Sequence, residues 1–286
     1  MKRIIKFILS ILVFLNIIAW TTVFHLSQPR VLKVVFFDVG QGDSIFIETP
    51  QRLQVLIDGG PDLTVLEKLA KEMPFYDRTI DLLILSHPEK DHLFGLLEVL
   101  KRYKVKNILW TGIIRNTAEW QEWKNLIEKE RAEIKIAEAG QKIILQENPL
   151  VLFNILYPFE NLDSKEVENS NDTSIIASLI FGAHSLLFTG DITKKTEQEL
   201  IAQDVYLNSV VLKIAHHGSK TSSSEEFLES VSPEVAVLSV GENKYGHPSP
   251  EVLANFEKFG IPVLITKEVG DIKIISDGEK YKISNF

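Results

Sequence analysis

The chain has 286 residues, of which 45% are hydrophobic and 24% are charged, a globular balance that excludes wholesale disorder. Its formal net charge of −8 argues against a protein that coats nucleic acid by bulk electrostatics, although bound cations would still permit a nuclease. Because the chain has no cysteine, disulfides, thiolate metal sites and cysteine nucleophiles are excluded.

The first predicted element is an apolar helix at residues 4–24. At about 1.5 Å per residue it would be roughly 30 Å long, enough to cross the hydrocarbon core of a bilayer. A cleaved signal peptide and a buried core helix are the alternatives, but the apolar run is longer than the apolar h-region of a usual signal peptide, and no A-x-A-like cleavage site occurs near its end. We therefore expect a transmembrane anchor at 4–24, a linker at 25–30 and one domain at 31–286, with the lipid bilayer as a partner.

The charges around the apolar helix predict its orientation. Lys2, Arg3 and Lys6 precede or open the run, whereas Arg30 and Lys33 lie just beyond it. The excess of basic residues at the N-terminus favours a cytoplasmic N-terminus. We expect a single-pass protein of the cell membrane with its domain outside the cytoplasm, or, if the segment is cleaved, a secreted protein.

Short apolar runs alternate with segments of helical spacing beyond residue 31. Strands are expected at 32–38, 44–48, 53–57, 81–86, 105–111, 174–181, 185–189, 210–215 and 235–240, in a strand-rich stretch up to 157 and in the tail from 263. Helices are expected at 62–71, 92–103, 117–130, 193–203, 224–231 and 250–259. This alternation fits two sheets with helices packed outside them.

The sequence HPEKDH at 87–92 places four potential metal ligands directly after a predicted strand. They are His87, Glu89, Asp91 and His92. A strand-to-helix turn lets such side chains converge above the end of the strand. The ordinary alternative is a solvated turn in which Asp91 caps the following helix.

Three further motifs also follow predicted strands. Asp191 ends a strand at a glycine turn, where it could instead cap the next helix. His216 and His217 end another strand, and because neighbouring strand residues point to opposite faces, we expect one of them to reach a shared site. His247 follows a further strand in the sequence YGHPS. Together the motifs hold five of the seven histidines, which makes four unrelated surface loops a poor explanation.

At these residues the chain resembles the metallo-β-lactamase superfamily, and within it the extracellular hydrolase domain of ComEC-type DNA-uptake proteins. The matching pieces occur in the family's order and cover about residues 31–270: DVGQGDS (38–44), LIDGG (56–60), SHPEKDH (86–92), NDTS (171–174), TGD (189–191), HHGS (216–219) and YGHPS (245–249).

The resemblance implies an α/β fold, a four-layer αββα sandwich with two divalent metal ions at one edge. It assigns His87 and Glu89 to the first metal and Asp91 and His92 to the second, with Asp191 bridging both. His216 would complete the second site, and His217 is the competing choice for that role.

Two departures from the superfamily pattern make the first site richer in oxygen. Glu89 stands where a second histidine is usual, as a carboxylate tends to in ComEC-type domains, and Asn171 opens NDTS where a separate histidine is expected. Oxygen ligands favour Mn²⁺ or Mg²⁺, whereas histidines suit Zn²⁺. We expect Zn²⁺ or Mn²⁺.

The resemblance implies hydrolysis by a hydroxide that two metal ions activate, on a phosphodiester and first of all on DNA. Asp91 would orient the nucleophile, and His247 would contact a substrate phosphate or protonate the leaving group. Asn171 is expected to bind substrate, as are Ser219 and Lys220, which lead into a helix N-terminus that could cradle an anion or could be a plain serine-rich cap.

Three other functions stay open at this point. The chain could hydrolyse an ester, a thioester or a lactam. It could be a binding module without turnover. It could also be a subunit of a DNA-uptake complex that acts with a polytopic membrane channel protein.

Overall fold

The computed structural model describes residues 2–27 and 31–285, in two units, Met1–Arg30 and Val31–Phe286. In the first unit α1 (Lys2–Ser27) contains an apolar stretch, Arg3–Val23, with a mean hydropathy of 2.2. That stretch is long and apolar enough to cross a membrane, a property that a signal sequence shares. The helix runs on from residue 24 to 27 into the predicted linker, whose residues 28–30 lie outside the described residues.

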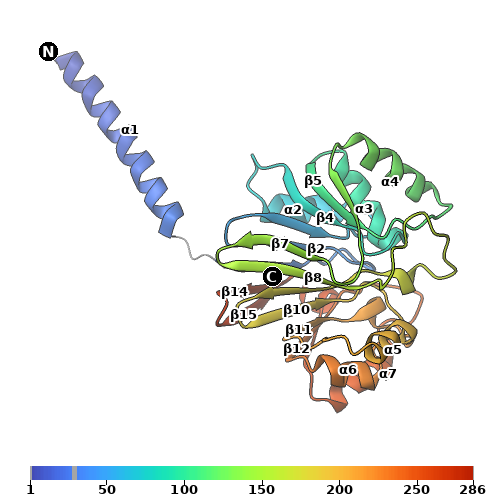
Figure 1. Ribbon diagram of the computed structural model, residues 1–286. Helices are drawn as coiled ribbons and strands as arrows, with labels where there is room; N and C mark the ends of the chain where they lie inside the picture. The colour runs from blue at the N-terminus through green and yellow to red at the C-terminus, as the bar shows by residue number, and fades with distance from the viewer. Residues whose placement is uncertain (1, 28–30, 286) are drawn as a thin grey trace. The chain divides into compact units, whose positions relative to one another are not determined.

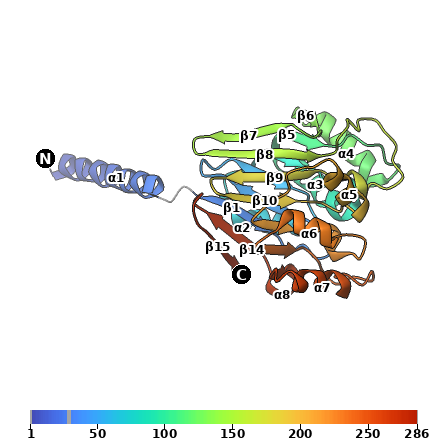
Figure 2. The same cartoon turned by 60° about the horizontal axis from the view of Figure 1, so that its bottom comes forward.

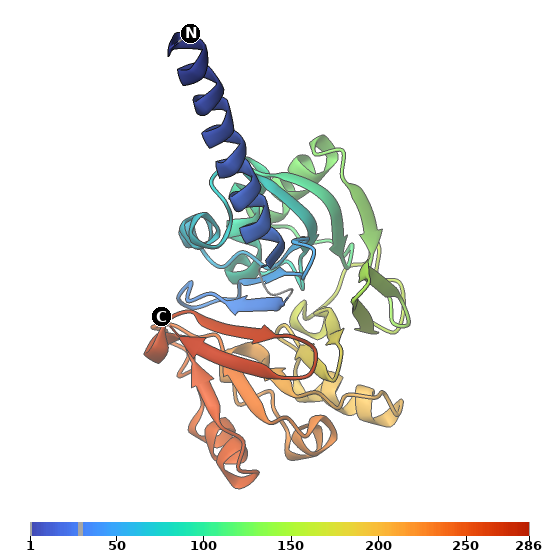
Figure 3. The same ribbon diagram turned by 90° about the vertical axis from the view of Figure 1, so that its left-hand side faces the viewer.

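The second unit is built on two mixed sheets (Figure 1). The first sheet has, in spatial order, β15 (Tyr281–Asn285), β14 (Ile272–Ser276), β1 (Leu32–Phe36), β2 (Ile45–Glu48), β3 (Gln54–Ile57), β4 (Thr79–Ile84), β5 (Lys104–Trp110) and β6 (Glu133–Ile136). The second has β13 (Val263–Ile265), β12 (Val235–Leu238), β11 (Val211–Lys213), β10 (His184–Phe188), β9 (Ile176–Phe181), β8 (Leu150–Tyr157) and β7 (Lys142–Glu147). Strands from the two ends of this unit meet where β14 pairs antiparallel with β1 (Figure 3).

Helices cover the outer face of each sheet. The first sheet carries α2 (Thr64–Glu72), α3 (Lys90–Leu100) and α4 (Ala118–Lys129), whose buried residues join one apolar cluster with that sheet (Figure 1). The second carries α5 (Lys194–Ala202), α6 (Glu225–Val231) and α7 (Pro250–Lys258), in a separate cluster (Figure 2). Three short helical segments complete the unit: η1 (Asn171–Thr173), η2 (Ala215–Gly218) and α8 (Thr266–Val269).

The main core lies between the two sheets, and strand alternation explains it. In β1, Val34 and Phe36 belong to the cluster between the sheets, whereas Val35 packs into the cluster under the outer helices. Both faces of such strands are covered, so their sequences are mostly apolar rather than alternating. The predicted four-layer αββα sandwich is confirmed.

The topology brings the ends of several strands to one edge. Strands β3 to β6 run parallel to one another in the first sheet, and β10 to β13 do so in the second. The carboxyl ends of parallel strands open at the same edge, where ligands bind in open α/β sheets. The segments after β4, β10, β11 and β12 carry the four polar motifs.

Some element boundaries differ from the sequence prediction. Helix α2 begins after Leu63, and Asp62 instead accepts a hydrogen bond from the backbone N–H of Thr64 at 2.8 Å. Helix α3 begins at Lys90, so Asp91 and His92 lie in its first turn. The tail is not all strand, because α8 separates β13 from β14. Boundaries depend on capping geometry, which residue periodicity does not resolve.

Candidate metal centre

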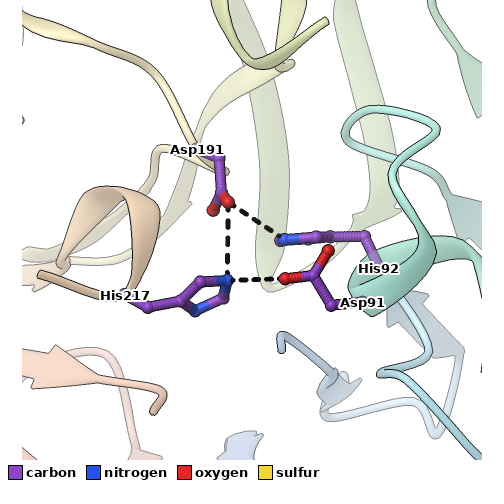
Figure 4. Close-up of side chains that lie close together, drawn as sticks. All are labelled: Asp91, His92, Asp191 and His217. Atoms are coloured by element: carbon purple, nitrogen blue, oxygen red, sulfur yellow. Dashed lines mark ion pairs between the residues drawn. The ribbon is translucent and has the colours of Figure 1, made fainter. Parts of the chain in front are cut away.

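Four side chains from three segments converge at the shared edge of the sheets. They are Asp91 and His92 from the start of α3, Asp191 after β10 and His217 after β11, and one ligand atom of each lies within 4.8 Å of the others. The Nε2 atom of His92 lies 3.3 Å from Asp191 Oδ2. The Nε2 atom of His217 lies 3.3 Å from Asp91 Oδ2 and 3.4 Å from Asp191 Oδ2. Figure 4 shows the four side chains pointing toward one another.

A tight turn after β10 aims Asp191 into this cluster. Gly190 has a φ of +51°, a left-handed conformation that favours glycine, and a Cβ there would lie 2.7 Å from the Cβ of Ser174. The backbone N–H of Asp191 donates to Ser174 Oγ at 3.0 Å. The turn is therefore held from the loop that follows β8, and a side chain at position 190 would displace it.

Each clustered histidine is oriented through its other ring nitrogen. The Nδ1–H of His92 donates to Asp58 Oδ2 at 2.8 Å, and Asp58 is itself held by the backbone N–H of Ser86 at 2.8 Å. The Nδ1–H of His217 donates to the carbonyl oxygen of Ser239 at 2.9 Å. In the neutral imidazole each Nε2 then keeps a free lone pair, which is how metal-ligating histidines are usually presented.

His87 is prepared in the same way just outside the four-residue cluster. The Ser86 hydroxyl donates its one hydrogen to Asp58 Oδ2 at 2.6 Å, so it accepts from His87 Nδ1 at 3.1 Å. Burial, followed by the neighbouring His92, lowers the pKa of His87 to about 3, which keeps the ring neutral. Its Nε2 lies 4.0 Å from Asp191 Oδ2.

These side chains fit a divalent cation. Among the described residues, the Nε2 atoms of His87, His92 and His217 and the Oδ1 atom of Asp191 are buried without a hydrogen-bond partner. Unpartnered buried polar atoms are costly and uncommon in folded proteins. Imidazole nitrogens and carboxylate oxygens that converge on one point are the donors that Zn²⁺ and Mn²⁺ bind.

The electrostatics of the cluster favour positive charge. Burial opposes the ionised form of Asp191, but His217 and His92 outweigh it and hold the pKa of Asp191 well below its ordinary value. Burial by itself would lower the pKa of His217, but the carboxylates of Asp191 and Asp91 have the larger combined effect and raise it to about 10. The carboxylates therefore hold positive charge strongly, so a cation that binds there must displace protons from the histidines.

Glu89 does not join the cluster. Its Oε1 accepts from Arg115 Nη2 at 2.8 Å and also from the hydroxyl of Ser170. A carboxylate already paired with a guanidinium is a weaker metal ligand than a free one. The first metal site that the resemblance implied is therefore not assembled around Glu89 in this arrangement.

His217, not His216, lies in the four-residue cluster, which reverses the order of preference predicted from the sequence. The expected strand alternation does not apply, because β11 ends at Lys213 and both histidines follow it in η2, each with a φ of 51°. His216 Nε2 lies 4.0 Å from Asp191 Oδ2 and accepts from the Asn171 side-chain amide at 3.2 Å. His216 and Asn171 thus lie beside the cluster, at the cavity above it.

The predicted anion cradle at the start of α6 already holds a carboxylate. The backbone N–H groups of Ser223 and Ser224 donate to Glu197. Ser219 is buried with its hydroxyl 2.9 Å from Thr221 Oγ1, and Lys220 is exposed. Neither Ser219 nor Lys220 lines the cavity over the cluster, so the expectation that they bind substrate is not supported by their placement.

A cavity of about 650 Å³ opens over the cluster. Its floor includes Asp191 and His217, and its wall includes His216 and His247. Burial, followed by His216 and His217, lowers the pKa of His247, so its imidazole is neutral, and its Nδ1 is buried without a hydrogen-bond partner among the described residues. The motifs after β4, β10, β11 and β12 thus share one cavity.

Sequence reasoning assigned no role to three buried residues that support the cluster: Asp43, Asp58 and Lys213. Lys213 is 1% exposed, contacts Asp43 Oδ2 and donates to the carbonyl oxygen of Gly190 at 3.0 Å. The sequence carries a signal for it, because a lone lysine at the end of an apolar run must find a buried partner. That partner lies 170 positions away and could not be chosen from the sequence.

Comparisons with known proteins agree with the fold and with the candidate metal centre described above. A sequence model of the family described as Metallo-beta-lactamase superfamily matches residues 37–242. ComE operon protein 3 of Bacillus subtilis (strain 168) is 32% identical over 261 residues, which cover 84% of this chain and 32% of that protein. Competence protein ComA of Neisseria gonorrhoeae is 32% identical over 246 residues, with the same two coverages of 84% and 32%. The chain spans about a third of the length of these curated relatives.

A solved structure shares the fold. The metallo-beta-lactamase fold protein YhfI from Bacillus subtilis matches with a TM-score of 0.57 and 13% identity, over 86% of this chain and 99% of that one. At this identity the likeness shows the fold alone.

Proposed function

The chain belongs to the metallo-beta-lactamase superfamily, a fold of metal-dependent hydrolases, and from that premise we propose that it is a phosphodiesterase that cleaves DNA. One observation carries the proposal. The Nε2 atoms of His92 and His217 converge with the carboxylates of Asp91 and Asp191, and three of these residues, Asp91, Asp191 and His217, line an open cavity. A fold hosts many chemistries, so the activity has to be argued from this site.

Asp91, His92 and His217 would hold one ion, and Asp191 would contribute its carboxylate both to that ion and to a second one. His87 and His216 each place Nε2 4.0 Å from the same oxygen of Asp191 and are the candidates for the second ion. Histidines suit Zn²⁺, whereas the carboxylates also admit Mn²⁺.

Glu89, which the resemblance placed with His87 at the first metal, would join this other ion only after releasing Arg115. That site is therefore expected to bind more weakly than the one around His217.

Divalent cations held at this site would supply Lewis-acid chemistry, which makes water a better nucleophile near neutral pH and polarises a phosphoryl oxygen. The Asp91 side chain is 34% exposed and lines the cavity, so it is placed to orient the attacking nucleophile. The lowered pKa of His247 favours a hydrogen bond to a substrate phosphate over proton donation to the leaving group. Asn171 lines the same cavity and would add an amide contact.

DNA is the preferred substrate because one relative is named a competence protein and competence is DNA uptake. We propose that α1 anchors the chain in the cell membrane with the hydrolase domain outside the cytoplasm, or is a cleaved signal of a secreted protein. The relatives are about three times longer than the segment they share with this chain, so a polytopic membrane channel protein is the partner we propose.

The proposal is tested on the full chain purified in detergent. Metal content is measured first, and then hydrolysis of single- and double-stranded DNA, a phosphodiester reporter, a thioester and a chromogenic lactam with Mn²⁺ or Zn²⁺. We expect metal-dependent cleavage of the phosphodiesters. Hydrolysis of the lactam or the thioester with intact DNA would replace the proposed function by another hydrolase activity.

Asp191→Asn provides the decisive variant, because it removes the charge that both ions would share. It is expected to lose turnover by at least a thousandfold while remaining folded. Asp204→Asn is the matched control, since Asp204 is an exposed aspartate outside the cavity. Wild-type rates in Asp191→Asn would refute the assignment of the bridge.

A further inference from the structure

A large aromatic side chain stands exposed at the rim of the cavity. Tyr245 is 76% exposed and lines the cavity whose floor is formed by Asp191 and His217. Exposed aromatic rings lose the stabilisation that burial would give, and their apolar faces are available to a ligand. The phosphodiester site described above needs contacts beyond the reacting phosphate, and Tyr245 is placed to make one.

The loop that carries Tyr245 is held in one conformation by a single side chain. The amide nitrogen of Asn243 donates to the carbonyl oxygens of Gly241 at 2.9 Å and His247 at 2.7 Å. The amide oxygen of Asn243 accepts from the backbone N–H groups of Tyr245 at 3.0 Å and His247 at 3.1 Å. A ring presented from such a loop is pre-organised and loses little conformational entropy when it binds a ligand.

Three aromatic rings lead from the rim toward the cluster. The ring centroids of Tyr245 and His247 are 5.8 Å apart, and those of His247 and His216 are 5.6 Å apart. His216 in turn reaches within 4.0 Å of Asp191 Oδ2. A nucleic-acid strand that runs along these rings could therefore place a phosphate over Asp191 and the face of a nearby base against Tyr245.

The charges at the rim suit a phosphate backbone. Lys244 and Lys90 line the cavity and are exposed; Lys90 lies 3.7 Å from Glu119, whereas no ion pair of Lys244 occurs among the described residues. The two glutamates of the cavity are paired with cations, Glu89 with Arg115 and Glu242 with Lys267. Lys244 therefore offers a positive charge at the rim with which a substrate phosphate could pair.

We propose that Tyr245 is a stacking platform for an unpaired nucleobase next to the scissile phosphate, and that it makes the site selective for single-stranded nucleic acid. This inference rests on the proposed function. In a duplex both faces of an internal base are covered by its neighbours, so only an unpaired base can offer a face to the ring. Stacking tolerates any base, which would give strand preference without sequence preference.

The test compares Tyr245→Ala with Tyr245→Phe in the full chain. Loss of one base–aromatic contact is expected to raise the KM for a single-stranded oligonucleotide about tenfold with little change in kcat. Tyr245→Phe keeps the ring and is expected to keep the wild-type KM. Tyr206→Ala is the matched control, because Tyr206 is 79% exposed but lines a different cavity.

An abasic substrate identifies the base that stacks. Oligonucleotides that lack one base at successive positions are compared, and one position is expected to raise the wild-type KM about tenfold. The same position should have no further effect in Tyr245→Ala, since the partner ring is already missing. An unchanged KM in Tyr245→Ala, or additive losses, would overturn the proposal.

Binding separates this inference from the proposed function. The affinity of each variant for a fluorescent single-stranded oligonucleotide is measured without turnover, by anisotropy. If wild type binds tightly, Tyr245→Ala binds about tenfold more weakly and no phosphodiester is cleaved, the stacking platform stands and the phosphodiesterase proposal fails. If wild type cleaves DNA and Tyr245→Ala binds the oligonucleotide as tightly as wild type does, the stacking platform fails and the phosphodiesterase proposal stands. If wild type binds no single strand, the stacking platform fails as well.

Discussion

Replacing Lys213 by methionine removes a buried positive charge beneath the metal cluster. Lys213 and Asp43 are each 1% exposed, and the Lys213 ammonium contacts Asp43 Oδ2 directly. The same ammonium lies 3.8 Å from Asp191 Oδ1. Lys213→Met keeps a long flexible side chain but removes the ammonium that contacts the Asp43 carboxylate directly, and leaves that carboxylate with His92 and His217, whose Nδ1 atoms are each 3.7 Å away.

The expected loss of stability is large. Removing one partner of a buried ion pair costs about 3–5 kcal/mol, because the remaining charge keeps its desolvation penalty. In a domain of this size each kcal/mol corresponds to about 2–4 °C, so the melting temperature should fall by roughly 6–20 °C. This is a large share of the ~5–15 kcal/mol by which most domains are stable.

Thermal unfolding followed by circular dichroism measures the effect, on chelator-treated protein so that metal binding does not contribute. A second variant combines Lys213→Met with Asp43→Asn and therefore buries no charge at either position. It should recover most of the lost stability, because neutralising both partners removes the penalty that breaking the pair creates. A single variant within about 1 kcal/mol of wild type, or a double variant no more stable than the single one, would refute this reasoning.

Three further predictions concern the cluster and a buried carboxyl group. His217→Ala should lower metal content far more than His216→Ala, because His217 contacts two clustered carboxylates; equal losses would contradict the assignment of the ion. Asp58→Asn should weaken metal binding about 10–100-fold in a chelator competition, because Asp58 orients His92; an unchanged affinity would show that this contact is dispensable. Burial raises the pKa of Glu197 above its ordinary value of 4.5, so the wild type should lose stability relative to Glu197→Gln as pH rises through the folded-state pKa. Urea unfolding of both proteins below pH 4.5 and near neutrality measures the difference between their free energies of unfolding. A difference that does not change with pH would contradict the raised pKa.

The strand ends and the ligand types at them were predictable because both are local. The run HPEKDH begins at residue 87, soon after β4, and the sequence predicted a helix that starts within it, although the structure begins that helix two residues earlier than expected, at Lys90. Asp191 follows β10 through a glycine turn that the sequence also displays. Hydrophobic periodicity marks where a buried strand stops, and polar side chains just beyond that point must face the edge of the sheet.

The choice between His216 and His217 was not predictable in this way. Both residues follow β11 in a left-handed conformation that no periodic pattern encodes, and the contact of His217 with Ser239 decides which ring turns into the cluster. The state of Glu89 likewise depends on Arg115, which lies on a loop after β5. These outcomes depend on loop geometry, which propensities do not determine.

The sequence by itself determined the family, the alternation of strands and helices and most of the candidate ligands, because apolar periodicity and short motifs act over a few residues. Only the tertiary structure decided which histidine lies in the cluster and that the carboxylate of Glu197 accepts the backbone N–H groups at the start of α6. It alone joined Lys213, at the end of β11 in the second sheet, to Asp43, in the loop before β2 of the first. Such pairings are fixed by how two sheets pack against each other, and residues that meet across that packing carry no mark of their partner in the chain.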